Sequence, residues 1–391
     1  MKNSGNSPLK ASIRNGVQLL VCRPLYLLLM VVLPLLFAFG FINLLDSGLP
    51  QRSPVAVVDL DGTPVSRTLT QNINSQMLIS VDYTADSYES ASRLVREGKI
   101  FGFFVIPRNF AADAGAGRET AIPFYCNMSY FVPGTMAYEA IMKVAVSAKG
   151  ELVAATAVGA GVTPIVVSNL LSPVSPQTNA IGNPWVNYNI YLSNSFIPCL
   201  FQLVIFQITA FTLLIGIKRR NSDKELALAG GSVVKYVLGR LIPQFIVFFA
   251  VGMALLGIMF GFNHFPMNGS FGGMILDMTL LIIASQAVGL FIASMVPNLR
   301  FAVSIASLVG ILSFSLAGFS YPVEDMAGAV GIFSYILPVR YYFLIYINTA
   351  LNGYELYYVG SYFLALLLFV VPPVFLLRRL RKSLANPVYI P

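Results

Sequence analysis

Apolar segments long enough to cross a membrane occur along this chain at very uneven intervals. One runs from about 25 to 45, and a mixture of polar and apolar residues extends from there to about 195. Five more then follow in close succession, near 196–217, 237–261, 273–296, 301–319 and 357–377. Each is about 19 to 25 residues long, which at ~1.5 Å per helical residue is enough to cross ~30 Å of hydrocarbon. The pattern predicts a polytopic α-helical membrane protein with six transmembrane helices.

The insertion 46–195, between spans one and two, has a different pattern, because short apolar runs alternate in it with amphipathic ones. These runs predict strands at Val55–Asp59, Met77–Tyr83, Phe101–Ile106 and Ala121–Cys126, and helices from Pro64 and over Ser87–Glu97. Alternation of this kind predicts a small α/β domain with a mixed sheet. After these elements we expect a long helix at about 134–158 and an irregular segment at 163–189.

Composition supports a membrane protein, because 56% of the residues are hydrophobic and only 11% are charged, against about 25% in soluble proteins. The net charge is +8, and the positions of the basic residues are also those of a membrane protein. Basic residues gather before span one, between spans two and three, at Arg300 and after span six, in segments that six spans leave on one side. The positive-inside rule therefore predicts that both termini are cytoplasmic and that 46–195 lies outside a bacterial inner membrane. We interpret the basic tail 378–391 as a topology anchor facing anionic lipid, not as a nucleic-acid site.

The chain has no signature of an enzyme. There is no GxxxxGK[ST] loop for a nucleotide phosphate. His264 is the only histidine, which excludes a histidine-based metal or catalytic cluster, and Cys22, Cys126 and Cys199 show no paired spacing. We therefore expect no catalytic site, metal or cofactor.

Residues 1–24 precede span one (25–45) and contain apolar residues at helical spacing: Leu9, Ile13, Val17, Leu20 and Val21. This stripe predicts an amphipathic helix that lies on the cytoplasmic leaflet, and a cytoplasmic extension of span one is the alternative.

Two connections in the region 196–377 also have distinctive sequences. The cytoplasmic loop 218–236 starts with charged residues and continues into a Gly230-Gly231-Ser232 break, before Gly239-Arg240 and Pro243 at the entry to span three. The external segment 320–345 contains Pro322 and Pro338, which break helices, and Met326 lies between them.

These features together resemble the type-2 ATP-binding-cassette (ABC) exporter permeases, and the resemblance covers the whole chain in topology. It implies that the N-terminal helix is an elbow helix, and that the loop 218–236 forms a short helix docked in a groove of a separate ATPase subunit. The coupling residues would be Asp223, Glu225, Leu226 and Leu228. Glu225 suits the helix dipole and is also expected to pair with a basic residue of the ATPase.

The resemblance further implies that 320–345 forms broken, re-entrant helices that cap the external end of the pore. The gate residues would be Pro322, Met326, Pro338 and Arg340. Two departures from the family pattern are visible, because the register of its Glu-x-Gly-Thr motif is loose here and Ala327 stands where a proline commonly follows the methionine.

Two ionisable residues in or near the spans are candidates for function. Asp277 lies near the start of span four, where an intramembrane carboxylate is a candidate functional residue and a hydrated interfacial residue is the alternative. Arg340 is expected either to meet a lipid phosphate or to form a salt bridge with Glu324 or Asp325.

The expected function is that of the permease subunit of an ATP-driven exporter for amphipathic, lipid-like or drug-like cargo. A second permease copy or paralogue and two ATPase subunits are the expected partners, with a periplasmic adaptor and outer-membrane channel as further candidates. The alternative is a membrane receptor or anchor that displays the external domain. A secondary transporter is disfavoured, because it would require buried coupling charges and repeated halves.

Overall fold

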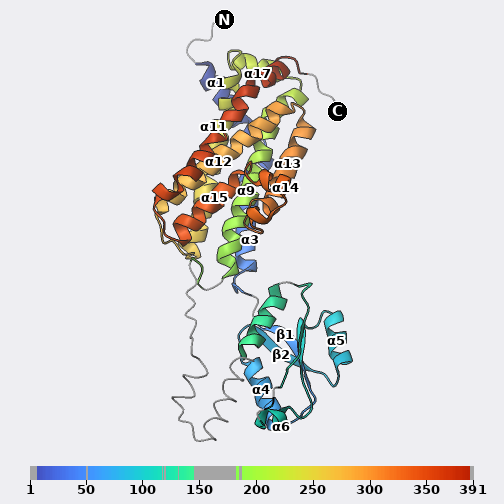
Figure 1. Ribbon diagram of the computed structural model, residues 1–391. Helices are drawn as coiled ribbons and strands as arrows, with labels where there is room; N and C mark the ends of the chain where they lie inside the picture. The colour runs from blue at the N-terminus through green and yellow to red at the C-terminus, as the bar shows by residue number, and fades with distance from the viewer. Residues whose placement is uncertain are drawn as a thin grey trace. The chain divides into compact units, whose positions relative to one another are not determined.

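The structure, a computed structural model, describes residues 7–49, 52–116, 118, 120–130, 132–144, 182–184 and 187–387. The chain divides into two compact units (Figure 1). The helical unit comprises Met1–Asp46 and Ala180–Pro391, and the inserted unit comprises Ser47–Asn179.

The inserted unit contains a four-stranded mixed sheet, as predicted. Its strands are β1 (Ser53–Asp59), β2 (Ile79–Thr84), β3 (Gly102–Ile106) and β4 (Phe124–Cys126), in the spatial order β2-β1-β3-β4. β1 pairs in parallel with β2 and β3, whereas β4 is antiparallel to β3. The helices in the described part of this unit are α4 (Pro64–Asn74), α5 (Tyr88–Arg96), α6 (Phe110–Gly115) and a helix over residues 132–144.

Helices cover both faces of this sheet, because the side chains of β1 alternate between two clusters. Val55 and Val57 pack in one cluster with Leu69 of α4. Ala56 and Val58 pack in the other with Ala91 of α5. The alternation follows from the period of two residues in a strand. The remainder of the helix predicted at 134–158, and most of the irregular segment predicted at 163–189, lie outside the described residues.

The helical unit contains the six predicted spans. Among the described residues, six helices are long and apolar enough to cross a membrane. They are Pro24–Leu44 (α2 Pro24–Leu27, η1 Leu28–Val32 and α3 Leu33–Leu44), α9 (Tyr188–Lys218), Val233–Phe262 (α11 Val233–Leu256 and η2 Gly257–Phe262), α12 (Phe271–Met295), α13 (Leu299–Leu316) and Leu356–Ala385 (η5 Leu356–Val359, α16 Gly360–Leu368 and α17 Val371–Ala385). The chain is therefore a polytopic helical membrane protein with an inserted α/β domain after span one.

Shorter helices complete the helical unit. They are α1 (Pro8–Val21), α10 (Ser222–Leu228), η3 (Val323–Asp325), α14 (Gly328–Ser334), α15 (Pro338–Tyr346) and η4 (Ile347–Leu351). The pair Gly328–Ser334 and Pro338–Leu351 is bent by 75° at its break, as in a broken span or a re-entrant loop. This break lies within the segment 320–345, for which broken, re-entrant helices are predicted.

α9 lies at the centre of the helical unit, in contact with α3, α12 and α13 (Figure 1). It begins at Tyr188, earlier than the predicted start near 196, so Tyr188 and Asn189 do not belong to the irregular segment 163–189. The polar residues of its first turns are buried and hydrogen-bonded. Asn189 donates to the carbonyl oxygen of Ile42 at 3.2 Å, and Ser193 donates to Oδ1 of Asn189 at 2.6 Å. These bonds allow a polar helix start inside the bundle.

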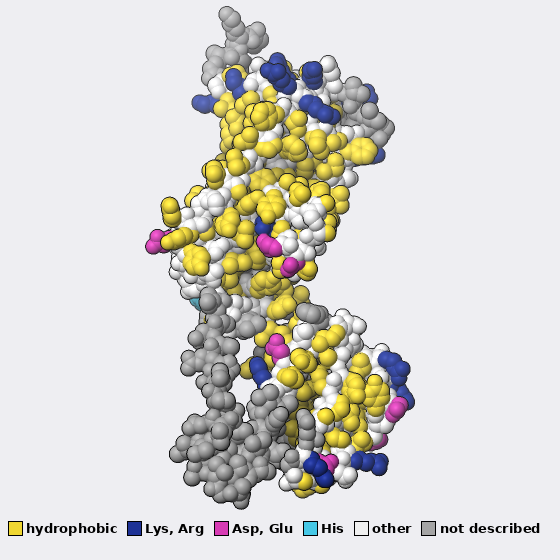
Figure 2. Space-filling model, viewed as in Figure 1, with side chains coloured by type: hydrophobic (Ala, Val, Ile, Leu, Met, Phe, Trp, Pro, Cys, Tyr) yellow, Lys and Arg dark blue, Asp and Glu magenta, His cyan; other side chains and the backbone are white. Residues whose placement is uncertain are grey.

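Lys and Arg side chains gather at the end of the helical unit that carries α1 and α17, above a broad hydrophobic surface (Figures 1 and 2). We call this end the basic face. It contains the start of α1, the connection from α9 to α11, and the last turns of α17.

Candidate coupling site at the basic face

α10 is a single short helix at the basic face, in the connection between α9 and α11. Arg220 turns the chain after α9 with a φ of 53°, and Gly230 and Gly231 turn it toward α11 with φ values of 69° and 72°. Glycine has no Cβ and adopts this left-handed conformation readily. The N–H groups of both glycines donate to carbonyl oxygens in α10, at 2.9 Å each. The Gly-Gly pair therefore ends the helix sharply.

The carboxylate of Glu225 in α10 points into the bundle, toward α11. Its Oε2 accepts a hydrogen bond from Nη2 of Arg240 at 2.7 Å, and the two side chains are only 10% and 2% exposed. Tyr236 lies beside the pair, with its ring centroid 5.4 Å from the Arg240 guanidinium carbon and its hydroxyl 3.5 Å from Glu225 Oε2. Breaking a buried ion pair by removing one partner costs about 3–5 kcal/mol, because the other charge is left uncompensated. The pair therefore fixes α10 to α11.

Gly216 of α9 makes room for this carboxylate. A Cβ at Gly216 would lie 2.7 Å from Oε2 of Glu225 and 3.3 Å from Ser222. A larger residue at this position would push α10 away from α9. The glycine therefore allows the short helix to pack directly on the end of span two.

α1 packs on α11 at a contact between two glycines. A Cβ on Gly16 would lie 2.1 Å from the carbonyl oxygen of Gly239, and a Cβ on Gly239 would lie 2.0 Å from Oγ of Ser12. Nη1 of Arg240 also donates to the carbonyl oxygen of Asn15 at 3.5 Å. Arg240 thus joins α1, α10 and α11.

The predicted amphipathic helix is present as α1, but of its predicted apolar stripe only Leu20 is fully buried, beside the buried small residues Ser12 and Gly16. Val17 and Val21, from the predicted apolar stripe, are 44% and 62% exposed. These valines are available to contact lipid, as an interfacial helix requires.

The last turns of α17 complete the surroundings of α10. Ser222 Oγ donates to the carbonyl oxygen of Leu384 at 2.7 Å. Leu380 and Leu384 are fully buried, whereas Arg378, Arg379, Arg381 and Lys382 are exposed. Part of the predicted basic tail is therefore a helix that packs its apolar side onto the candidate site.

The four residues predicted to contact an ATPase do not share one surface. Asp223 and Leu228 are exposed, whereas Glu225 and Leu226 are buried. The expectation that Glu225 pairs with a basic residue of a partner chain differs from the structure, in which its Oε2 pairs with Arg240 of the same chain. The sequence analysis did not predict this pair. The signal for it was Arg240, a residue of opposite charge that lies 15 positions after Glu225, beyond the Gly-Gly break.

The predicted gate residues lie around the bent helix pair. Pro322 precedes η3, Met326 follows it, and Pro338 is at the first turn of α15, where proline is compatible with a helix. The side chain of Gln202 in α9 accepts a hydrogen bond from the backbone N–H of Val339 at 2.8 Å. The start of α15 is therefore held against the central helix.

Arg340 is 9% exposed and its nearest partners are uncharged. Nη1 donates to the carbonyl oxygen of Ala317 at 3.4 Å, and the guanidinium carbon lies 5.0 Å from the ring centroid of Tyr335. Gly318, with a φ of 93°, leaves room for this side chain. The salt bridge expected with Glu324 or Asp325 is not formed, because within the described ranges both carboxylates are exposed and the ion pairs involve other residues.

Asp277 in α12 is fully buried, and neither of its carboxylate oxygens has a hydrogen-bond partner among the described residues. The hydroxyl of Tyr342 in α15 is equally buried and also has none in that part of the chain. The alternative of a hydrated interfacial carboxylate does not agree with this burial. Asp277 lies in the second turn of α12, a helix that contacts α15 of the bent pair.

Comparison with known proteins gives one family for this architecture. A family model described as "ABC-2 family transporter protein" matches residues 24–376, from the first span to the last. A search of curated proteins gives no match.

Proposed function

This chain belongs to the ABC-2 transporter family, and we propose that it is the permease subunit of an ATP-driven exporter. In this proposal a separate ATPase subunit supplies the energy, and the permease itself hydrolyses no ATP. A second permease copy or paralogue and a pair of ATPase subunits complete the transporter.

The observation that carries the proposal is the buried Glu225–Arg240 pair. α10 has seven residues, too few for a helix to be stable alone. The ion pair fixes α10 to α11, and the Ser222 hydrogen bond fixes it to α17. α11 is in turn packed against α1 at the Gly16–Gly239 contact. A force applied to α10 would therefore move α1 and span three with it, which is what a coupling element requires.

The exposed side of α10 is the proposed docking surface for the ATPase. Asp223 lies in its first turn, where the helix dipole favours an acidic residue. Leu228 is 53% exposed at its other end. An apolar side chain at this position is suited to a groove on a partner. We propose that Asp223 and Leu228 contact the ATPase, while Glu225 and Leu226 hold α10 in place.

The proposed cargo is amphipathic or lipid-like. Among the described residues of the six spans, Arg240 and Asp277 are the only buried Asp, Glu, Lys or Arg residues, and Arg240 is paired. A small number of buried charges suits an apolar cargo, and it leaves few sites at which a coupling ion could bind. The bent pair with Pro322, Met326, Pro338 and Arg340 is the proposed outer gate, and Asp277 lies next to it.

The proposed orientation follows from the charges. The basic face is cytoplasmic, in a bacterial inner membrane, and the inserted unit lies outside, where it gates the exit or recruits a periplasmic adaptor and outer-membrane channel. In a cysteine-free background, an impermeant maleimide should label Glu89→Cys in intact spheroplasts and should not label Asp223→Cys. The reverse labelling pattern would overturn this orientation.

The decisive experiment is reconstitution of the permease in proteoliposomes with a candidate P-loop ATPase subunit. We expect Leu228→Asp to reduce permease-dependent stimulation of ATP hydrolysis by at least tenfold, with normal expression and melting temperature. The matched control is Tyr357→Asp, because Tyr357 is 86% exposed and remote in sequence from α10.

Unchanged stimulation in Leu228→Asp would remove α10 as the docking element. If the wild-type chain neither binds nor stimulates the ATPase, the permease proposal fails, and a membrane anchor that displays the inserted domain becomes the better interpretation.

A further inference from the structure

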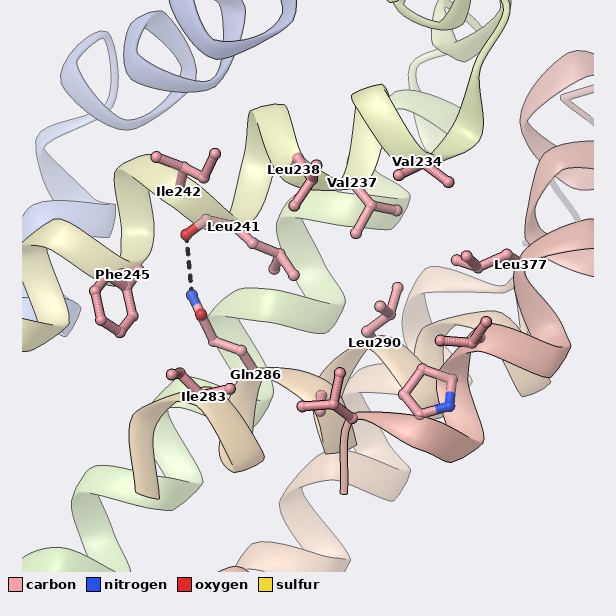
Figure 3. A pocket seen from close by; sticks show the side chains of 14 residues that line it. Val234, Val237, Leu238, Leu241, Ile242, Phe245, Ile283, Gln286, Leu290 and Leu377 are labelled. Carbon is pink, nitrogen blue, oxygen red and sulfur yellow. Dashed lines mark hydrogen bonds between the residues drawn. The ribbon is translucent and has the colours of Figure 1, made fainter. Parts of the chain in front are cut away.

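An apolar groove lies between α11, α12 and α17, near the basic face (Figure 3). It has a volume of about 380 Å³, and 13 of its 14 lining residues are apolar. In Figure 3, Val237 and Leu241 of α11 lie opposite Leu290 of α12, with Leu377 of α17 at one end. The amide of Gln286 donates to the carbonyl oxygen of Leu241 at 3.1 Å, so its nitrogen is satisfied within the chain.

The groove has the length of one bilayer leaflet. Along α11 its lining runs from Val234 to Phe245, about 16 Å at ~1.5 Å per residue, which is close to half of a ~30 Å hydrocarbon core. Its rim is open, because Val234, Leu238 and Val374 are 48%, 40% and 57% exposed. An extended alkyl chain can therefore enter it from the side and end near the middle of the membrane.

Basic side chains stand at the end of the groove nearest the basic face. Lys235 follows Val234, and Arg378 and Arg381 are one and two helical turns beyond Val374 on the same side of α17. All three are exposed, and the ion pairs in the described ranges involve other residues. Basic clusters next to a transmembrane helix bind anionic lipid headgroups.

We propose that this groove holds one acyl chain of a resident anionic glycerophospholipid, with the phosphate on Lys235, Arg378 and Arg381. The chemistry of the groove favours an anionic lipid over a helix from a second copy, because an apolar lining ends beside three exposed basic side chains, as an apolar chain with a charged headgroup requires. The proposal goes beyond the transport function and holds with or without an ATPase.

The test is photo-crosslinking of the full chain, without ATPase, in phosphatidylcholine vesicles that contain a phosphatidylglycerol with a diazirine in its acyl chain. We expect lipid adducts on residues lining the groove. Ala287→Phe fills the groove and should reduce these adducts about tenfold. The matched control is Ile246→Phe, because Ile246 is on the same helix as the groove lining, is 62% exposed and lines no part of the groove.

The headgroup is tested by competition. Unlabelled phosphatidylglycerol should displace the probe at least tenfold better than added phosphatidylcholine, and the Lys235→Gln/Arg378→Gln double variant should lose that preference. Arg300→Gln, an exposed basic position outside the groove, should keep it.

Equal competition by the two lipids in the wild type, or adducts that persist in Ala287→Phe, would overturn the proposal. Crosslinks from the groove to a second copy instead of lipid would also overturn it. If Ala287→Phe does not fold, the double variant decides alone, and an unchanged preference in it contradicts the proposal.

Discussion

Glu225 in α10 and Asp277 in α12 are both buried carboxylates in the helical unit, but their surroundings differ. Glu225 is paired with Arg240 at 2.7 Å and lies among closely packed helices. Asp277 has no hydrogen-bond partner among the described residues, and the nearby region includes a bend of 75° between two helices. The first carboxylate has a charged partner, whereas the second has no partner among the described residues that would stabilise a charge.

The difference indicates two kinds of role. A paired buried charge fixes the geometry of the elements that carry it, and Glu225 joins the proposed coupling helix to span three. An isolated ionised carboxylate is very costly in a medium of low dielectric constant, so we expect Asp277 to be the neutral acid at rest. We therefore expect the helices at the basic face to be rigid. We expect the helices of the bent pair to adopt a second conformation more readily than those at the basic face.

The largest expected effect is on the paired carboxylate. Glu225→Ala leaves the guanidinium of Arg240 buried without its partner, so we expect a loss of about 3–5 kcal/mol in the free energy of unfolding. The Glu225→Ala/Arg240→Ala double variant should lose less than the sum of the two single variants. Thermal and denaturant unfolding of the detergent-purified chain measures this. Asp223→Ala is the control, and we expect it to change the free energy of unfolding little because Asp223 is exposed. A loss in Glu225→Ala as small as that of the control would contradict the account.

The next effect tests the packing beside that pair. Gly239→Ala places a methyl group where Ser12 and the backbone of α1 now lie, so we expect a loss of about 1–3 kcal/mol. Detachment of α1 should also increase its protease sensitivity. Gly257→Ala, later in the same span and with nothing within 4 Å of the added Cβ, should leave stability unchanged or slightly raised. Equal behaviour of the two variants would show that the contact is loose.

A smaller effect is expected at the unpaired carboxylate. Asp277→Asn replaces a neutral acid by a neutral amide of nearly the same shape, so the free energy of unfolding should change by less than about 1 kcal/mol. Infrared difference spectra of the wild type should contain the carbonyl band of a protonated carboxyl group, absent in Asp277→Asn. A loss as large as that of Glu225→Ala would show that Asp277 is ionised and paired.

Asp59 in the inserted unit gives the smallest effect, because water reaches it. Burial raises its pKa, but the hydrogen bonds from Ser66 and from the N–H groups of Gly62 and Asp61 outweigh this and hold the pKa below its ordinary value. A lowered pKa stabilises the fold above the unfolded value of about 3.9, and this contribution is lost as the pH falls through the folded pKa. At neutral pH, the amides of β1 should therefore exchange more slowly in the wild type than in Asp59→Asn. In acid, the exchange rates of the two proteins should become equal. A constant difference would contradict this.

Local pattern predicted most of the fold. Short apolar runs located β1 and β3, Pro64 marked the start of α4, and hydropathy located the six spans. The start of α9 was missed because Asn189, Ser193 and Asn194 read as a polar loop. Their side-chain N–H and O–H groups are buried because carbonyl and side-chain oxygens in neighbouring turns and in span one accept hydrogen bonds from them.

The candidate site could be predicted only in part. Its location followed from the charged loop and the Gly-Gly break, which are local signals. The inward direction of Glu225 and the contact between Gly16 and Gly239 depend on how helices distant in sequence pack together. A single sequence contains no direct record of such contacts, and the same limit applies to the burial of Asp277.

The central claim is that the exposed side of α10 is where an ATPase docks, and site-specific crosslinking tests it most directly. Leu228→Cys in a cysteine-free permease should crosslink to a single-cysteine ATPase in proteoliposomes, with a yield that changes on addition of ATP. Tyr357→Cys should give no crosslink under the same conditions. A crosslink at Tyr357, or none at Leu228 across several ATPase positions, would contradict the account.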